Sequence, residues 1–80
     1  MYKLSTSDQV GHLLTARRKE LGLTQAAVAA RLGISQNRLS ELEKQPSLLT
    51  FDRLLALAGI LEVELLLQER DQNTQVQSEW

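Results

Sequence analysis

Residues 36–40 concentrate side chains that offer paired hydrogen-bond donors and acceptors. Gln36 and Asn37 carry amides, Arg38 a guanidinium and Ser40 a hydroxyl. Ordering such flexible side chains on a surface costs conformational entropy, so their concentration points to a ligand with matching polar groups. Base edges in the major groove of DNA are one such ligand, because an amide can pair with adenine and a guanidinium with guanine. An ordinary solvated helix face is the simpler alternative.

A helix is expected ahead of this cluster. Thr6 and Gln9 have the three-residue spacing of a capping box. Gly22 can adopt the left-handed conformation that commonly follows the end of a helix. The apolar residues in between fall near one face of the expected helix: Val10, Leu13, Leu14 and Leu21.

Two further helices are expected on either side of a tight turn at Gly33. Thr24 would cap the first, over residues 25–32, and Ser35 would cap the second, which continues to about Lys44. Glycine suits the turn because it adopts a positive φ at no steric cost. The polar cluster then lies on the outer face of this third helix, opposite two inward residues: Leu39 and Leu42.

A fourth helix is expected after Pro46, with Ser47 as its N-cap and Gly59 at its end. We expect residues 1–69 to form one domain for DNA binding and dimerisation. The inward face of the fourth helix would consist of Leu48, Phe51, Leu54, Leu55 and Ala58.

Apolar residues alternate with mostly polar neighbours in residues 61–68, which is typical of a strand, although a short helix is also compatible. A lone strand leaves backbone groups without partners. No other stretch alternates convincingly, so we expect the same strand of a second copy to pair with it. Residues 62–68 would carry this dimer interface, with apolar contacts from Val63, Leu65 and Leu67.

Residues 70–80 are polar apart from Val76 and Trp80, and we expect a disordered tail. A tryptophan on such a tail offers a large apolar face to a pocket on another chain. We therefore interpret Trp80 as a partner-binding residue. The alternatives are a passive end of the chain and a degradation signal.

The composition limits the classes of function. The chain has 80 residues and no cysteine, so we expect one small domain without disulfides or a thiolate metal site. A single histidine, His12, and the lack of a glycine-rich phosphate loop argue against an enzyme, a bound metal or a cofactor. With no signal peptide and no membrane-spanning apolar run, a cytoplasmic protein that does not contact membranes is expected.

Charge is unevenly distributed along the chain. The formal net charge is -1, yet residues 1–44 hold seven basic and four acidic residues, whereas the remainder holds two basic and six acidic residues. A basic front half is compatible with a nucleic-acid partner despite the negative total.

The second and third expected helices have the residue pattern of a helix-turn-helix. Ala29 would lie where the two helices cross, where a larger side chain would hold them apart. The full pattern consists of Gln25, Val28, Ala29, Leu32, Gly33, Ile34, Leu39 and Leu42. The segment LTQAAVAARLGISQNRLSELE resembles the helix-turn-helix of the Cro/C1 (Xre-type) repressor family, and PSLLTFDRLLALAGI resembles its fourth helix.

The resemblance implies a mainly all-α, lambda-repressor-like domain of four to five helices that binds double-stranded DNA. The front of the third helix would lie in the major groove, where Gln36, Asn37 and Ser40 face base edges and Arg38 takes a guanine or a phosphate. The implied DNA-binding residues outside that cluster, which contact the backbone, are Thr24, Gln25, Ser35 and Lys44.

The family pattern also assigns roles to other charged residues. It pairs Arg18 with Glu43 inside the domain, whereas Arg17 and Lys19 stay open between solvated charges and backbone contacts. Only Lys44 and Gln45 separate Glu43 from Pro46, which is shorter than the usual loop of the family.

The added strand and the tail with Trp80 are most similar to those of HipB-type antitoxins, which are dimeric operator-binding repressors that also bind a HipA-type serine/threonine kinase toxin. The resemblance thus implies a homodimer on an inverted-repeat operator and a HipA-like kinase partner. A plain Xre-type regulator without a toxin partner is one alternative. A protein-interaction module of the same fold is another, but a protein-docking helix would carry apolar anchors in place of the polar cluster.

Overall fold

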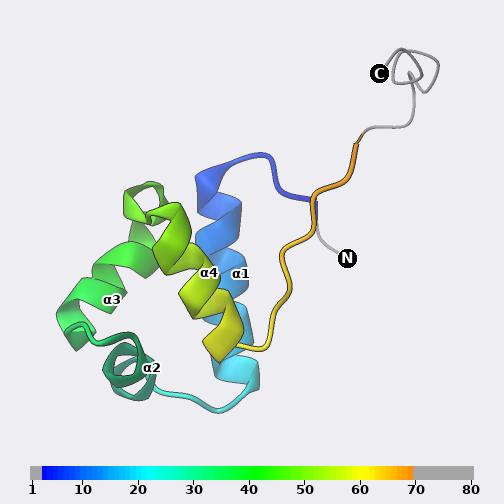
Figure 1. Ribbon diagram of the computed structural model, residues 1–80. Coiled ribbons are helices and arrows are strands. Elements are labelled where there is room, and N and C mark those ends of the chain that lie inside the picture. The colour runs from blue at the N-terminus through cyan, green and yellow to red at the C-terminus, as the bar shows by residue number, and fades with distance from the viewer. Residues whose placement is uncertain (1–2, 70–80) are drawn as a thin grey trace.

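The computed structural model describes residues 3–69, in which short helices pack around a common core (Figure 1). The elements are α1 (Ser7–Glu20), α2 (Gln25–Leu32), α3 (Gln36–Lys44), the 3-10 turn η1 (Pro46–Leu48) and α4 (Phe51–Ile60). The expected all-α fold is confirmed. No helix within the described range is long and apolar enough to cross a membrane. The predicted tail, with Trp80, lies outside the described residues.

The predicted capping box begins α1. Thr6 Oγ1 accepts a hydrogen bond from the N–H of Gln9 (3.4 Å), and Gln9 Oε1 accepts one from the N–H of Thr6 (3.1 Å). The helix ends at Glu20, and Gly22 follows with a φ of +71°. The boundaries of α1 were therefore predicted correctly from its caps.

The turn between α2 and α3 is also built as predicted. Thr24 Oγ1 accepts a hydrogen bond from the N–H of Ala27 (3.0 Å), and Ser35 Oγ accepts one from the N–H of Arg38 (3.0 Å). Between the two caps, Gly33 has a φ of +75°, which a residue with a Cβ adopts only with strain. These features fix the residue at which α3 begins and hence the side chains that it presents.

All four α-helices contribute to a small core, to which Leu61 is added just beyond α4. Gly11 lets α1 lie directly against the α3–η1 junction, because a Cβ there would be 2.5 Å from Pro46 Cγ and 2.6 Å from the Glu43 carbonyl oxygen. The buried apolar residues are Leu14, Val28, Ala29, Leu39, Leu42, Leu57, Ala58 and Leu61.

The predicted start of the fourth helix is wrong. Ser47 is not an N-cap but the middle residue of η1, which Pro46 begins and which closes with a bond from the N–H of Leu49 to the Pro46 carbonyl (3.0 Å). Thr50 caps α4 instead and accepts a hydrogen bond from the N–H of Arg53 (3.1 Å). Ser47 and Thr50 both have a side chain that can cap a helix. Because Pro46 begins a 3-10 turn that includes Ser47, Thr50 is the residue that caps α4.

The predicted inner face of α4 is wrong in part. Phe51, Leu48 and Leu55 are 68%, 44% and 44% exposed, whereas Leu57 and Ala58 are buried. Apolar residues occupy nearly every side of this helix, so helical periodicity could not identify the buried side. Gly59 does not end α4, which continues to Ile60.

Beyond α4 the chain turns back on the helix end. Glu62 adopts a φ of +59°, and the N–H of Val63 donates to the Ala58 carbonyl (2.9 Å). Val63 packs half-buried against the core, while residues 64–69 are exposed. The structure assigns no strand within residues 3–69. Pairing of residues 62–68 with the same segment of a second copy of the chain stays a prediction.

Candidate nucleic-acid interface

The outer face of α3 presents the polar cluster to solvent. Leu39 and Leu42 are 0% and 3% exposed, and their burial fixes the rotation of α3 about its axis. The first turn of the helix must therefore direct its polar side chains away from the core. The exposed residues there are Ser35, Gln36, Asn37 and Arg38, followed by the half-buried Ser40.

Arg38 has a partner on its own helix. Its Nη1 donates to Glu41 Oε1 at 3.0 Å, and the two side chains are 48% and 62% exposed. An exposed pair at this spacing stabilises a helix by only about 0.2–0.5 kcal/mol. Arg38 can therefore leave Glu41 for a guanine or a phosphate at little cost.

The start of α2 is tied to α3. Gln25 Nε2 donates to Glu43 Oε1 (3.0 Å). The amide that is expected to contact the DNA backbone is therefore also bonded to α3. The amide nitrogen of Gln25 carries two N–H groups. One of them donates to Glu43, so the other is available for a second hydrogen bond. Thr24, which caps α2, is exposed beside it.

A buried ion pair lies behind Gln25. Arg18 donates from Nε to Glu43 Oε2 (2.8 Å) and from Nη2 to Glu43 Oε1 (3.3 Å), and the two side chains are 11% and 9% exposed. Arg18 Nη1 also donates to the Leu23 carbonyl (3.0 Å) in the α1–α2 loop. The pair implied by the family pattern is therefore present, and it joins α1, the α1–α2 loop, α2 and α3.

The pKa of the Glu43 carboxyl is lowered in the folded protein. Burial alone raises this pKa, because it disfavours the charged form. Hydrogen bonds from Arg18 and Gln25 and the positive charge of Arg18 outweigh burial. The folded domain thus holds Glu43 as a carboxylate.

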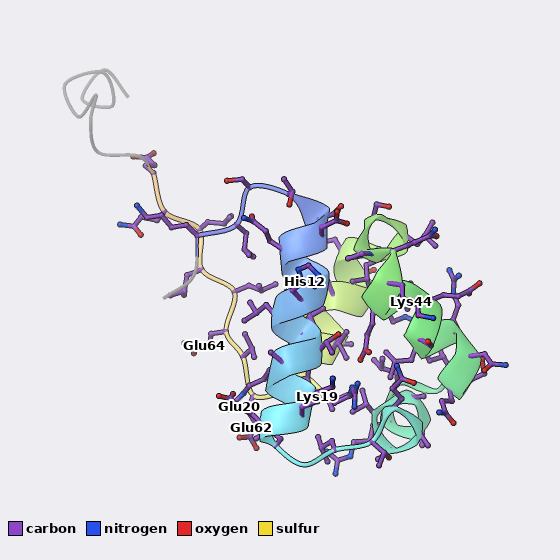
Figure 2. The ribbon with its side chains drawn as sticks, turned by 180° about the vertical axis from the view of Figure 1, so that it is seen from behind. His12, Lys19, Glu20, Lys44, Glu62 and Glu64 are labelled. Carbon is purple, nitrogen blue, oxygen red and sulfur yellow. The ribbon has the colours of Figure 1, made fainter. Side chains whose placement is uncertain are left out.

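Lys44 is the last residue of α3 and is exposed, and Figure 2 shows it on the side of α3 that faces α1. The residues implied as backbone contacts therefore come from the start of α2 and both ends of α3. Their contacts with DNA stay a prediction.

Arg17 has a role that the sequence analysis missed. Its Nε donates to the Leu61 carbonyl just after α4 (3.0 Å), and its guanidinium lies 3.1 Å from Glu20 and 3.8 Å from Glu62. Arg17 therefore holds the end of α4 and the start of the C-terminal segment. A bond to a backbone carbonyl 44 residues away has no sequence signal that could have revealed it.

Metal ligation is not indicated by the described part of the chain. Residues 3–69 contain no group of three or more His, Cys, Asp or Glu side chains that could hold a metal ion.

Comparisons with known proteins agree with this geometry. A family model described as helix-turn-helix matches residues 14–68. The chain is 42% identical over 60 residues to the uncharacterized HTH-type transcriptional regulator y4dJ of Sinorhizobium fredii, covering 71% of this chain and 78% of that protein. It is also similar to a solved HipB-O1-O2 complex, with a TM-score of 0.78 and 25% identity over 86% of this chain and 100% of the HipB chain. The resemblance to the Xre-type, HipB-like fold is thereby confirmed.

The lowered pKa of Glu43 makes stability depend on pH. The folded protein binds a proton at Glu43 less readily than the unfolded chain, whose carboxyl has a pKa near the ordinary 4.5. The stabilisation is therefore present above about pH 4.5 and is lost as the pH falls through the folded pKa. We expect the free energy of unfolding, measured by urea titration, to fall on acidification below that pH.

The control for this prediction keeps the core but removes the titrating pair. Arg18→Met combined with Glu43→Leu replaces the ion pair by apolar side chains and should retain the fold with a shallower acid profile. Glu41→Gln, which removes an exposed carboxylate, should keep the wild-type profile. An unchanged acid profile in the double variant would contradict the assignment to Glu43.

Proposed function

The chain belongs to the helix-turn-helix family of transcriptional regulators, and we propose that it binds a specific operator as a dimer and represses transcription there. The observation that carries this proposal is the exposure of the polar side chains in the first turn of α3, which the bond between Gln25 and Glu43 sets beside the start of α2. A helix presented in this way fits the major groove, while the preceding helix start meets the sugar-phosphate backbone.

Within that geometry the side chains divide into two roles. Gln36, Asn37 and Arg38 carry the bidentate groups that distinguish adenine and guanine, so they are proposed to read sequence. Thr24, Gln25, Ser35 and Lys44 are proposed to set register on phosphates, with Ser40 at close approach to a base edge.

The dimer is proposed to form through α4 and the C-terminal segment. Phe51 and Leu55 of α4 are exposed, as are Leu65 and Leu67, which are 40% and 103% exposed. An 80-residue chain that leaves this much apolar surface uncovered gains from association. Two-fold symmetry would then place two α3 helices on inverted half-sites roughly 34 Å apart.

A finer proposal concerns a protein partner. The likeness to HipB supports a role as the antitoxin of a HipA-like serine/threonine kinase, with Trp80 as the residue that docks into the partner. A plain Xre-type regulator has the same DNA-binding surface and differs only in lacking this partner. The polar face of α3 disfavours a protein-interaction module without DNA binding.

The division of roles on DNA predicts different behaviour for two glutamine variants. Gln36→Ala should relax preference at one or two base positions, at a cost of about 1–3 kcal/mol. Gln25→Ala should weaken binding to all sequences more evenly, because a phosphate contact carries no base preference. The measurement is the affinity of each variant for a panel of single-base variants of a duplex that the wild-type protein has selected from a random library. Equal specificity profiles would refute the roles.

The proposed interface predicts that Leu67→Asp gives a monomer with at least about tenfold weaker operator affinity, because each half-site is then bound alone. Val63 is a poorer choice, since it packs against the core of its own chain. Gln68→Asp is the matched control, with the same charge introduced at a neighbouring polar position. Light scattering and DNA titration test both; a monomeric Leu67→Asp variant with unchanged affinity would place the interface elsewhere.

The antitoxin proposal predicts that Trp80→Ala weakens binding to a purified HipA-like kinase while operator affinity is unchanged. A buried aromatic anchor of this size commonly supplies much of the affinity of a docking interface. Val76→Ala, on the same segment, is the control. The measurement is calorimetry of each variant with the kinase. Equal affinities of wild type and Trp80→Ala would contradict the docking role of Trp80. If neither binds the kinase, the chain is better described as a plain Xre-type regulator.

A further inference from the structure

An open groove of about 740 Å³ lies between α1, the start of α2 and the second half of α3. Its floor is the Arg18–Glu43 ion pair. Figure 2 looks onto this side of the molecule, where His12 and Lys19 project from α1 and Lys44 projects from α3. The walls include Asp8, His12, Lys19, Gln25, Ser40 and Lys44.

The groove borders the proposed DNA-binding surface. Gln25, Ser40 and Lys44 line it and also belong to the set proposed to contact DNA. A sugar-phosphate strand that touches both Gln25 and Lys44 must therefore cross the groove mouth, with α1 on its far side. Of the two α1 residues for which a backbone contact was left open, Lys19 lines this groove, whereas Arg17 is held by the Leu61 carbonyl.

The charges of the groove suit a phosphate strand. Arg18 and Glu43 neutralise each other across the floor. Lys19 and Lys44 are exposed on the walls, and within residues 3–69 neither forms an ion pair. Asp8 is the one other carboxylate among the lining residues, at the outer end of α1. The walls therefore carry a net positive charge before His12 is counted.

We propose that this groove is a second site for the DNA backbone, in which Lys19 contacts a phosphate and His12 adds a further contact once it is protonated. The proposal rests on the proposed function, because it extends the same DNA complex onto α1. Operator affinity would then rise as the pH falls through the range in which imidazole gains its proton.

The charged residues around His12 influence how strongly operator affinity depends on pH. On α1 they are Asp8, one turn earlier, and Arg18 and Lys19; on α3 they are Glu43 and Lys44. Glu43 is engaged by Arg18, so Asp8 and the two lysines act on His12 with opposite signs. The decisive change on binding is a phosphate at the groove mouth, which favours the imidazolium.

The test measures affinity for a duplex selected from a random library by the wild-type protein, at about pH 6 and about pH 8. Wild type should bind about three- to tenfold more tightly at the lower pH, because a bound phosphate favours the imidazolium. His12→Gln should lose this dependence. His12→Lys, with a fixed charge, should bind at the higher pH as tightly as wild type binds at the lower one.

Salt dependence tests Lys19 separately. Lys19→Gln should reduce the slope of log affinity against log salt by about 1 without altering base preference. Arg53→Gln removes one charge from α4, outside the groove, and is the matched control. All of these side chains lie outside the core, so the variants should fold, and thermal unfolding checks that they do.

These experiments distinguish failure of the groove proposal from failure of the proposed function. If a duplex is selected but His12→Gln and Lys19→Gln keep the wild-type pH and salt profiles, the groove proposal is overturned and the proposed function stands. If no duplex is enriched, sequence-specific operator binding fails instead. The same pH and salt measurements on an unrelated duplex at low salt then still decide the groove proposal, since phosphate contacts are independent of sequence.

Discussion

The geometry of this domain depends on the ion pair between Arg18 and Glu43. Removing one partner of a buried pair typically costs about 3–5 kcal/mol, whereas replacing both by apolar side chains is often neutral. The intact pair is therefore costly to break, although an apolar replacement of both partners need not lower net stability. Because a guanidinium has fixed donor geometry, its bonds to the Leu23 carbonyl and the Glu43 carboxylate restrict how α1, the α1–α2 loop and α3 lie relative to one another.

This fixed arrangement bears directly on the proposed binding of DNA. Base readout requires donors to be placed within a few tenths of an ångström of their targets, and short helices on a small core do not ensure that alone. Because Gln25 bonds the same carboxylate that Arg18 holds, the start of α2 and the body of α3 cannot shift independently. A phosphate contact at Gln25 would consequently set the register of Gln36 and Asn37 on the bases.

The parts of the structure that were predictable from the sequence are those encoded locally. Thr24, Ser35 and Gly33 act through neighbours within a few residues, so the helix-turn-helix and the outward face of α3 could be derived from residue type and spacing. The start of α4 offered two competing caps, and its apolar residues on several sides left the buried face undetermined. Contacts between distant residues, such as that of Arg17 with the Leu61 carbonyl, left no local trace.

The ion pairs of Arg17 also bear on how a chain of net charge -1 distributes its charge. Arg17 pairs with Glu20 and Glu62, which Figure 2 shows on the side of α1 away from Lys44, whereas Lys19 lines the groove. Glu62, just after α4, is thereby held beside Arg17 and not beside α3. Since charges separated by more than about 10 Å are largely screened at 0.1 M salt, a phosphate at α3 would respond to the local lysines and arginines. The arrangement of charge, and not its sum, determines whether such a surface can bind DNA.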